Sequence, residues 1–493
     1  MSGVNYEFNF SKKFYFYAFF ALLFLLISRL VLMHFIPLMD STEARYGEIA
    51  REMLRSGNWI TLLHNNGLPF LAKPPLSTWL SAASMGLFGV NEFAARLPNL
   101  LLSIAILWLV WDFAKKRTNS SVAIITVLFL AGNLFYFLNA GTVMTDSTLI
   151  FCTTLSLLAF WRAMVDQSRT WAYLFFIGLG LGLLAKGPIA TVLTAMPIFF
   201  WVLIHKQWRA LWLNLPWIKG SFLALAIALP WYILAEIRNP GFINYFVIGE
   251  HFNRFFIPNW NGNHYGFSHA KPYGMIWIYT LCGLYPWSPL ALYWLFKHRK
   301  KLSSLFKQED DGWLSYLLLC TFLPLFFFTF SRNIIYTYVF PSLPAAALLF
   351  AELWRRSGIR EQIANKIICL STLPGLIFLL IASVFLLNPG NLPKSQKPVA
   401  NAWKIQNPSP EAKLIYWASI LHYSAQFYSD GQAIEVNNLS TLRKLIAKNP
   451  DSYLVMKTAQ PNHIPKDLLA QFSEVGRVKV VKKEILILRH NKN

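Results

Sequence analysis

The sequence predicts an all-α polytopic membrane bundle with a small C-terminal α/β domain, and three observations lead to this fold class. The chain of 493 residues is 55% hydrophobic and only 14% charged, which exceeds what the core of a soluble protein needs. Residues 1–388 consist mainly of long apolar runs separated by short polar loops. Residues 389–493 instead alternate strand-like and helix-like segments, so we expect a domain boundary near residue 388.

A membrane-spanning helix needs about 20 apolar residues, and eleven segments of the chain come close to that length. The first follows Lys12 and Lys13 and lacks a cleavage site of small residues, so we expect a retained span and not a signal peptide. The eleven segments are 14–36, 94–113, 121–139, 147–165, 171–185, 188–204, 220–237, 273–296, 312–330, 334–352 and 367–388.

The formal net charge of +22 raises the possibility of nucleic-acid binding. The basic residues, however, occupy short loops between apolar runs, which is typical of the cytoplasmic side of a membrane protein, so we expect no nucleic-acid partner. If the spans alternate, the loops 37–93, 140–146 and 238–272 and the C-terminal domain lie on the outer side. The basic residues expected on the cytoplasmic side are Lys115, Lys116, Arg117, Arg162, Arg169, Lys206, Arg209, Lys297, Arg299, Lys300, Lys301, Arg355, Arg356 and Arg360.

The segment that follows the first span predicts an amphipathic helix that ends at Gly57. Such a helix lies in the membrane surface, with its apolar face in the acyl boundary and its charges in water. The apolar face consists of Tyr46, Ile49, Ala50, Met53 and Leu54, and the charged face consists of Arg45, Glu48, Arg51, Glu52 and Arg55.

The C-terminal segment after residue 389 predicts a small α/β domain that carries no recognisable catalytic motif. We expect it to have a structural role or to bind an acceptor. The predicted strands are 413–417, 433–436, 453–456 and 478–481, and the predicted helices are 419–428, 440–448 and 465–473.

Three acids on the outer side are candidate catalytic residues. Asp40 and Glu43 follow the first span, and two roles are open to them: an N-cap with its capping-box partner, or a carboxylate that deprotonates an acceptor hydroxyl or amine. Asp146 stands at the outer end of a span, where an acid is costly unless it is paired or functional. It either caps the next helix or contributes to a site that converges with Asp40.

Five cations on the outer side are not explained by membrane orientation. A polyanionic ligand explains them, because Arg binds phosphate in a bidentate manner and Lys binds it as a point charge. The alternatives are ion pairs along the helix surface for Arg45 and contact with lipid headgroups for Lys73. Pro74 and Pro75 fix the backbone after Lys73. The five cations are Arg45, Lys73, Lys186, Lys271 and Arg332.

The loop 238–272 contains Glu250 and the histidines His251, His264 and His269, which raises the possibility of a zinc site. Their spacing matches no zinc signature, so we expect these side chains to position a sugar or a lipid headgroup, with no metal and no cofactor.

The combination of motifs resembles the bacterial protein-mannosyltransferase-like family, which includes the aminoarabinose transferases of lipid A. The resemblance covers residues 10 to about 350 and leaves the C-terminal domain outside. It is carried by 45–54 (Arg-Tyr-x-Glu-Ile-Ala-Arg-Glu-Met-Leu), 73–76 (Lys-Pro-Pro-Leu), 96–98 (Arg-Leu-Pro), 145–147 (Thr-Asp-Ser), 185–188 (Ala-Lys-Gly-Pro), 250–255 (Glu-His-Phe-x-Arg-Phe) and 336–341 (Tyr-Thr-Tyr-Val-x-Pro).

The resemblance implies a GT-C glycosyltransferase, a hexosyl or pentosyl transferase in the bacterial cytoplasmic membrane. Such an enzyme moves a sugar from a polyprenyl-phosphate carrier to lipid A, another glycolipid or a protein on the outer, periplasmic face. The implied catalytic acids are Asp40 or Glu43 and Asp146, and Lys73 binds the carrier phosphate. The other implied or candidate substrate-binding residues are Arg45, Tyr46, Lys186, His251, His269, Lys271, Arg332 and Tyr338.

Two positions depart from the aminoarabinose transferases. Thr42-Glu43 stands where those enzymes carry Asp-Glu before the Arg-Tyr segment, and Ala72 stands where they carry Glu before Lys-Pro-Pro. Two other functions stay open: a transporter or flippase of polyprenyl-linked glycans, and a ligase of such glycans. A transporter is expected to show an internal repeat and charged or broken spans at mid-depth, whereas the ionisable residues here gather at one membrane face.

Overall fold

The structure is a computed structural model that describes residues 10–65, 67–262, 265, 269–300, 311–358, 361–387, 394–458, 464–480 and 483–491. The chain forms two compact units, and each is described by itself. The first comprises residues 1–31, 71–77 and 97–378, and the second comprises residues 32–70, 78–96 and 379–493. The predicted soluble domain 389–493 belongs to the second unit, and its boundary near residue 388 stays a prediction.

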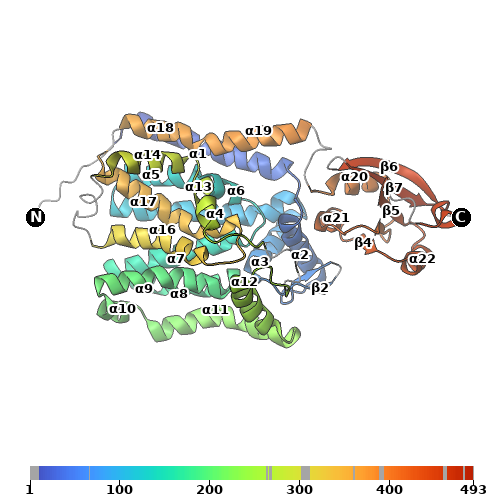
Figure 1. The fold of residues 1–493 in the computed structure, drawn as a ribbon, viewed down its shortest axis with the longest axis horizontal. Helices are drawn as coiled ribbons and strands as arrows, with labels where there is room; N and C mark the ends of the chain where they lie inside the picture. The colour runs from blue at the N-terminus through green and yellow to red at the C-terminus, as the bar shows by residue number, and fades with distance from the viewer. Residues whose placement is uncertain are drawn as a thin grey trace, which may run out of the picture. The chain divides into compact units, whose positions relative to one another are not determined.

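The first unit is a bundle of helices (Figure 1). Helix α7 packs on α8 and α9, α8 packs on α11, and α16 packs on α9 and α17. Two further helical segments, the π-helix η1 (Asn244–Asn253) and the 3-10 helix η2 (Tyr336–Ser342), border the candidate site. The helices are α1 (Lys12–Phe35), α4 (Glu92–Arg117), α5 (Ser120–Ala131), α6 (Leu134–Asn139), α7 (Asp146–Val165), α8 (Arg169–Lys186), α9 (Pro188–His205), α10 (Trp208–Asn214), α11 (Trp217–Arg238), α12 (Arg254–Phe256), α13 (Met275–Gly283), α14 (Trp287–His298), α16 (Trp313–Thr329), α17 (Leu343–Arg356), α18 (Glu361–Ser371) and α19 (Leu373–Leu387), of which α1, α4 and α19 contribute residues to both units.

Each of the eleven predicted spans contains at least one helix, which confirms the helical membrane fold. In the described part of the chain, seven helical segments are long and apolar enough to cross a membrane. Two of the other predicted spans are interrupted. The span 121–139 breaks at Asn133, whose side chain accepts from the backbone N–H of Tyr136 and starts α6. The span 273–296 breaks before Trp287, where Pro286 has no backbone N–H to continue a helix.

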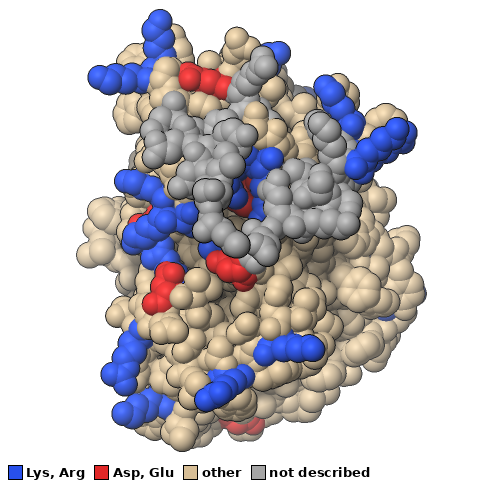
Figure 2. All heavy atoms as spheres, turned by 90° about the vertical axis from the view of Figure 1, so that its left-hand side faces the viewer, with Lys and Arg blue, Asp and Glu red and all other residues tan. Residues whose placement is uncertain are grey.

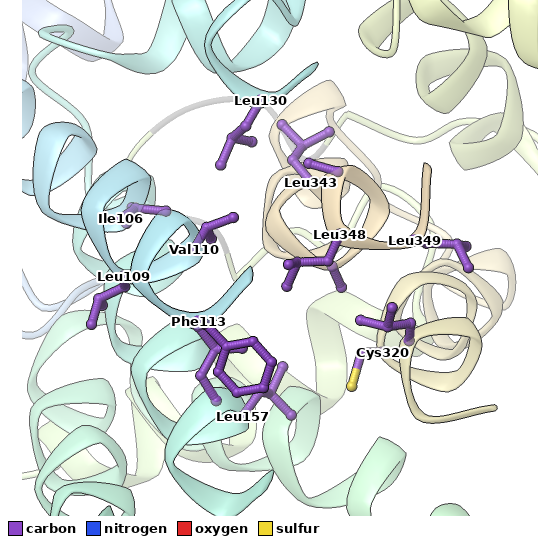
Figure 3. Close-up of a cluster of buried hydrophobic side chains, with 14 of the residues drawn as sticks. Ile106, Leu109, Val110, Phe113, Leu130, Leu157, Cys320, Leu343, Leu348 and Leu349 are labelled. Atoms are coloured by element: carbon purple, nitrogen blue, oxygen red, sulfur yellow. The ribbon is translucent and has the colours of Figure 1, made fainter. Parts of the chain in front are cut away.

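Apolar side chains from several of these helices form one buried cluster in the bundle (Figure 3). Burial of such side chains fixes how the helices pack, because each removes apolar surface from contact with solvent. Those on view include Ile106, Val110 and Phe113 of α4, Leu157 of α7, Cys320 of α16, and Leu343, Leu348 and Leu349 of α17.

Lys and Arg side chains project from the end of the bundle at which α4 and α17 end (Figure 2). Lys115, Lys116 and Arg117 belong to the last turn of α4, and Arg355 and Arg356 belong to the last turn of α17. The orientation of this end toward the cytoplasm stays a prediction. Lys301 and Arg360 lie outside the described residues.

The second unit contains an open five-stranded sheet with strand order β4-β3-β5-β7-β6. Strand β3 is parallel to β4 and to β5, whereas β7 is antiparallel to β5 and β6. Ala425 of α21 and Trp403 of α20 share one core cluster, and Leu442 of α22 and Leu468 of α23 share another. The elements are β3 (Leu414–Trp417), β4 (Ala433–Val436), β5 (Tyr453–Lys457), β6 (Phe472–Val480), β7 (Lys483–His490), α20 (Lys397–Ile405), α21 (Tyr423–Tyr428), α22 (Leu439–Lys448) and α23 (Lys466–Leu469).

This sheet confirms the predicted α/β alternation, although helix α20 was not predicted and other boundaries differ. Helix α23 ends at Leu469, and the segment predicted to be helical up to residue 473 enters β6 at Phe472. Strand β7 was not predicted, although its sequence Ile485-Leu-Ile-Leu488 is apolar. The unit also contains α2 (Thr42–Ser56), α3 (Leu76–Phe88) and the short hairpin β1 (Leu63–His64) and β2 (Leu68–Pro69).

The prediction that the whole charged face of helix α2 lies in water is wrong. The helix ends at Gly57 as predicted, where the backbone is left-handed at φ 68°, and Arg55 is exposed, but two other charged residues are buried. Glu48 is 2% exposed and Arg51 is 4% exposed, and the Nε of Arg51 lies 2.7 Å from Glu48 Oε2. Helix α21 packs on α2, and a Cβ at Gly47 would stand 3.7 Å from Phe427. A second helix therefore covers part of the face that the sequence assigned to solvent.

Candidate functional site

A buried carboxylate with two cations around it forms the centre of the candidate site in the first unit. The side chain of Glu250, in η1, is 1% exposed. Its Oε2 accepts from Lys73 Nζ at 3.1 Å and from Arg254 Nη1 at 2.9 Å, and its Oε1 accepts from the Tyr245 hydroxyl at 3.3 Å. Arg254 follows Glu250 by four residues, so successive turns of the helical segment present both side chains together.

Burial and the neighbouring charges in this cluster shift the pKa values of Glu250 and Lys73. Burial opposes ionisation of Glu250, but Lys73 and Arg254 outweigh it and hold the pKa of the carboxyl at about 2. Burial lowers the pKa of the Lys73 ammonium to about 8, and the nearby charges of Arg254 and Lys186 act in the same direction against the pull of Glu250. Glu250 is thus a fixed anion, and Lys73 is a cation that gives up its proton more easily than an ordinary lysine.

Another ion pair of this unit, between Asp146 and Lys186, joins two helix ends. Asp146 is the first residue of α7, Lys186 is the last residue of α8, and Lys186 Nζ lies 2.6 Å from Asp146 Oδ1. An acid at a helix N-terminus and a base at a C-terminus both complement the helix dipoles. Lys186 Nζ also lies 5.6 Å from the centre of the Tyr338 ring, so η2 contributes an aromatic face.

Three polar side chains hold the turn that leads to Asp146. Arg29 of α1 donates to the carbonyls of residues 138 and 140 and to the hydroxyl of Thr142. Asn99 of α4 donates to the carbonyls of Thr142, at 2.5 Å, and Met144, at 3.2 Å. Ser77 donates to Met144 O at 3.2 Å. Asp146 therefore starts its helix from a fixed turn, and a fixed carboxylate is what proton transfer requires.

His251 connects the two ion pairs through the backbone. Its Nδ1 lies 2.8 Å from Phe246 O, and its Nε2 lies 3.3 Å from Lys186 O. Burial is the main cause that lowers the pKa of the His251 imidazole. The predicted residues Lys73, Asp146, Lys186, His251 and Tyr338 thus belong to one group in the first unit.

The remaining predicted cations of this unit belong to a neighbouring set of loop segments. The backbone N–H of Lys271 donates to Arg332 O at 3.1 Å, that of Ile334 donates to His269 O at 3.2 Å, and the guanidinium of Arg332 lies 4.6 Å from the centre of the Tyr273 ring. Burial lowers the pKa of His269, and Arg254 is among the charges that add to this effect. His264 lies outside the described residues.

Asp40, predicted as a catalytic acid, belongs to the second unit and is bonded to residues just before and within α21. Its Oδ1 accepts from the backbone N–H of Ser424 at 3.0 Å, its Oδ2 accepts from the Ser424 hydroxyl, and Oδ2 lies 3.7 Å from Nδ1 of His422. Burial raises the pKa of the Asp40 carboxyl, although the bonds from Ser424 oppose the rise. Asp40 is not the N-cap of α2, because the helix begins at Thr42 with Ser41 before it.

Glu43 forms a bidentate ion pair with Arg96 in the same unit. Arg96 Nε lies 2.8 Å from Glu43 Oε1, and Nη2 lies 2.7 Å from Oε2. Arg96 also donates to the carbonyls of Met33, in the last turn of α1, and of Ile36 and Pro37, which follow the helix. Met39 N donates to Glu43 at 3.4 Å, so the predicted capping box between Asp40 and Glu43 is not formed.

We expect the Arg96→Met substitution to lower the free energy of unfolding by about 3–5 kcal/mol, because it removes the cation that neutralises a buried carboxylate. Arg96 is 3% exposed, so water does not replace the lost bonds. Thermal denaturation of the detergent-solubilised protein measures the effect. The double substitution Arg96→Met with Glu43→Gln is expected to recover part of the loss, and a single variant as stable as the parent would contradict the assignment.

Arg45 and Tyr46, predicted to bind substrate, take part in an aromatic cluster of the second unit. The guanidinium carbon of Arg45 lies 5.5, 5.3 and 5.8 Å from the ring centres of Tyr46, Phe70 and Tyr423. Burial is the main cause that lowers the pKa of the neighbouring His64 to about 4, and the charge of Arg45 contributes. A cation between aromatic faces is held in place for packing or for recognition of an anion.

Sequence reasoning expected Glu250 only to help position a sugar or a lipid headgroup and gave Arg254 no role, although both stand in the Glu-His-Phe-x-Arg-Phe motif. The i, i+4 spacing of opposite charges was the available signal. The contact with Lys73, 177 residues away in the sequence, was not available. In the described part of the chain, no three His, Cys, Asp or Glu side chains are arranged to hold a metal ion.

The chain is similar to known membrane glycosyltransferases. Residues 11–246 match the family described as dolichyl-phosphate-mannose-protein mannosyltransferase. The undecaprenyl phosphate-alpha-4-amino-4-deoxy-L-arabinose arabinosyl transferase of Pseudomonas savastanoi pv. phaseolicola is 30% identical over 63% of this chain and 56% of its own length. The second such transferase of Sodalis glossinidius is 30% identical over 71% of this chain and 62% of its own length. The chain thus spans little more than half the length of the curated relatives it matches.

A solved structure shares the fold. The crystal structure of ArnT from Cupriavidus metallidurans bound to undecaprenyl phosphate has a TM-score of 0.74 and 19% sequence identity, and the match covers 96% of this chain and 97% of that one. At this identity the likeness shows the fold alone, and it extends to the C-terminal region that the sequence resemblance left out.

Proposed function

We propose that the chain is a membrane glycosyltransferase that uses a polyprenyl-phosphate-linked sugar, and the match of residues 11–246 to the dolichyl-phosphate-mannose-protein mannosyltransferase family supports this proposal. The observation that carries the proposal is the pair of cations, Lys73 and Arg254, held 3.1 and 2.9 Å from the carboxylate of Glu250. Both cations are positioned before any ligand arrives, so they offer a preorganised site for a phosphate.

The carrier phosphate binds to Lys73 and Arg254. In the transfer step, an acceptor oxygen attacks the anomeric carbon of the sugar and the bond from that carbon to the phosphate oxygen breaks. The negative charge that develops on the leaving phosphate is stabilised by the two cations. The proton of the acceptor passes to a carboxylate, a role that we assign to Asp146; Glu250 is a poor base, because two cations hold its pKa at about 2.

We propose a pentosyl group as the transferred sugar and a glycolipid as the acceptor. The curated relatives are named as arabinosyl transferases of an undecaprenyl phosphate-linked amino sugar, which supports the pentosyl group. Nothing among these relatives supports a protein acceptor. The reaction takes place on the outer side of the membrane if the basic end of the bundle faces the cytoplasm.

Transfer by the purified protein in lipid nanodiscs tests the proposal. Undecaprenyl-phosphate-linked aminoarabinose or a hexose is supplied together with a lipid A acceptor or an acceptor peptide, and release of undecaprenyl phosphate is followed. We expect release with the pentosyl donor that requires the lipid acceptor. Movement of intact donor across the bilayer without release of undecaprenyl phosphate would instead identify a flippase and contradict the proposal.

The transfer reaction is expected to weaken at alkaline pH. The pKa of Lys73 is about 8, so the ammonium that binds the phosphate is present below that pH and is lost as the pH rises through it. The value of kcat/KM, which reports the free enzyme, should therefore fall about tenfold per pH unit above about pH 8. The Lys73→Arg variant keeps its charge and should show no such fall. A parent profile that stays flat to about pH 10 would contradict the role of Lys73.

A further inference from the structure

A pocket of about 290 Å³ lies in the α/β part of the second unit, and none of its lining residues is assigned to the transfer reaction. It opens at the carboxyl ends of the parallel strands β3 and β5, where Tyr416, Met456 and Lys457 contribute to its wall. The segment that follows β3, which includes Ser419 and His422, contributes a second side.

The position of the pocket follows from the topology of the sheet. The chain leaves β3 through α21 to reach β4 on one side, then leaves β4 through α22 to reach β5 on the other side of β3. Helices α21 and α22 pack in different core clusters, because the two connections cover opposite faces. Open α/β sheets bind ligands in the crevice that such diverging connections leave outside the carboxyl ends of the strands.

The charge of the pocket indicates an anionic ligand. Lys394, Lys457, Lys483 and His422 line it, and its lining contains no acidic residue. In the part of the chain that the structure describes, no carboxylate lies within 4.0 Å of the ammonium group of any of these three lysines. Asp40 is 3.7 Å from His422 but accepts its hydrogen bonds from Ser424 and does not line the pocket.

The floor and the wall of the pocket differ in polarity. The buried lining residues Tyr416 and Gln396 form the floor, where the Tyr416 hydroxyl donates a hydrogen bond to Gln396 Oε1 at 3.2 Å and so fixes the amide. The wall includes Met456 and Ile420, and Ile420 is 76% exposed. A ligand that combines a phosphate, hydroxyl groups and an apolar part can contact the lysines, the floor and the wall. Inorganic phosphate can contact only the lysines.

We propose that this pocket binds a phosphorylated sugar headgroup, and that it recognises the headgroup of the acceptor glycolipid. The assignment of the pocket to the acceptor glycolipid rests on the proposed function. The binding of a phosphorylated sugar headgroup rests on the pocket alone. Lys457 and Lys483 supply point charges for a phosphate, and Gln396 and Tyr416 supply hydrogen bonds for the sugar. The apolar wall accepts the part of the lipid next to the headgroup.

Binding to the full-length protein in detergent tests the site. Glucosamine 1-phosphate, inorganic phosphate and glucosamine are the three probes, and isothermal titration calorimetry measures their affinities. We expect glucosamine 1-phosphate to bind more tightly than the other two, and the double substitution Lys457→Gln with Lys483→Gln to weaken it at least about tenfold. The double substitution Lys444→Gln with Lys448→Gln changes the same charge on exposed positions of α22 and should leave binding unchanged.

Three results would overturn the proposal: no binding of glucosamine 1-phosphate, equal binding of inorganic phosphate, or equal binding by the Lys457/Lys483 variant. None of them involves the sugar donor, so failure here is separate from failure of the transfer assay. If transfer occurs, the same variant should raise KM for the lipid acceptor and leave KM for the donor unchanged. An unchanged acceptor KM would overturn the assignment of the pocket to the acceptor.

Discussion

Replacing Lys73 with alanine is expected to lower the rate of sugar transfer by about 10²–10³-fold, because it removes a cation that stabilises the leaving phosphate. Lys73 is partly buried, and its ammonium is held 3.1 Å from Glu250. We therefore expect that neither water nor a flexible side chain replaces the lost ammonium. The Lys73→Arg variant should retain a larger share of the activity, since it keeps a cation of altered shape. Release of undecaprenyl phosphate under single-turnover conditions measures the chemical step.

A matched control for Lys73→Ala is Lys219→Ala, which removes the same charge from an exposed position on α11 of the same unit. The control should transfer sugar at the parent rate. Thermal denaturation shows whether each variant is folded. A folded Lys73→Ala protein with the parent rate would end the assignment of Lys73 to the carrier phosphate, and with it the proposed phosphate site.

The Asp146→Asn substitution is expected to lower kcat by about 10²-fold with little change in KM for the donor, because it preserves the shape of the side chain but removes the proton acceptor. Asp146 is 4% exposed and begins α7 from a turn held by Arg29, Asn99 and Ser77, so the amide should occupy the place of the carboxylate. The same variant assayed with an acceptor of lower pKa should lose less activity, since such an acceptor needs less help from a base.

The Asp112→Asn variant is the matched control for Asp146→Asn. It shows whether activity is lost because a base is missing or because an ion pair is missing. Asp112 pairs with Arg162 at 2.8 Å in the same unit, as Asp146 pairs with Lys186 at 2.6 Å, but it stands near the basic end of α4. The Asp112 variant should keep its transfer activity. Equal losses in the two variants would mean that Asp146 acts only through the pair with Lys186, and catalysis would then have to rest on Asp40 or Glu43.

The corrected positions show what local patterns leave undetermined. Helix α2 was predicted from its periodicity to lie at a surface, and the periodicity is real, but Arg51 and Glu48 are buried where α21 packs on the helix. The residues of α21 lie more than 300 positions further along the sequence, so no window around α2 contains them. Similarly, Asp40 was predicted to cap α2, and the structure instead bonds it to Ser424, while its role as a base stays a prediction.

The sequence by itself determined the helical membrane fold, the orientation signal and the α/β alternation at the C-terminus. These properties depend on the length of apolar runs, on the charge of short loops and on residue periodicity, which are all local. Only the tertiary structure decided which charges meet, namely Lys73 with Glu250 and Arg254, Asp146 with Lys186, and Glu43 with Arg96. An ion pair depends on two side chains within a few ångströms, and the packing of the helices, not their spacing along the chain, sets that distance.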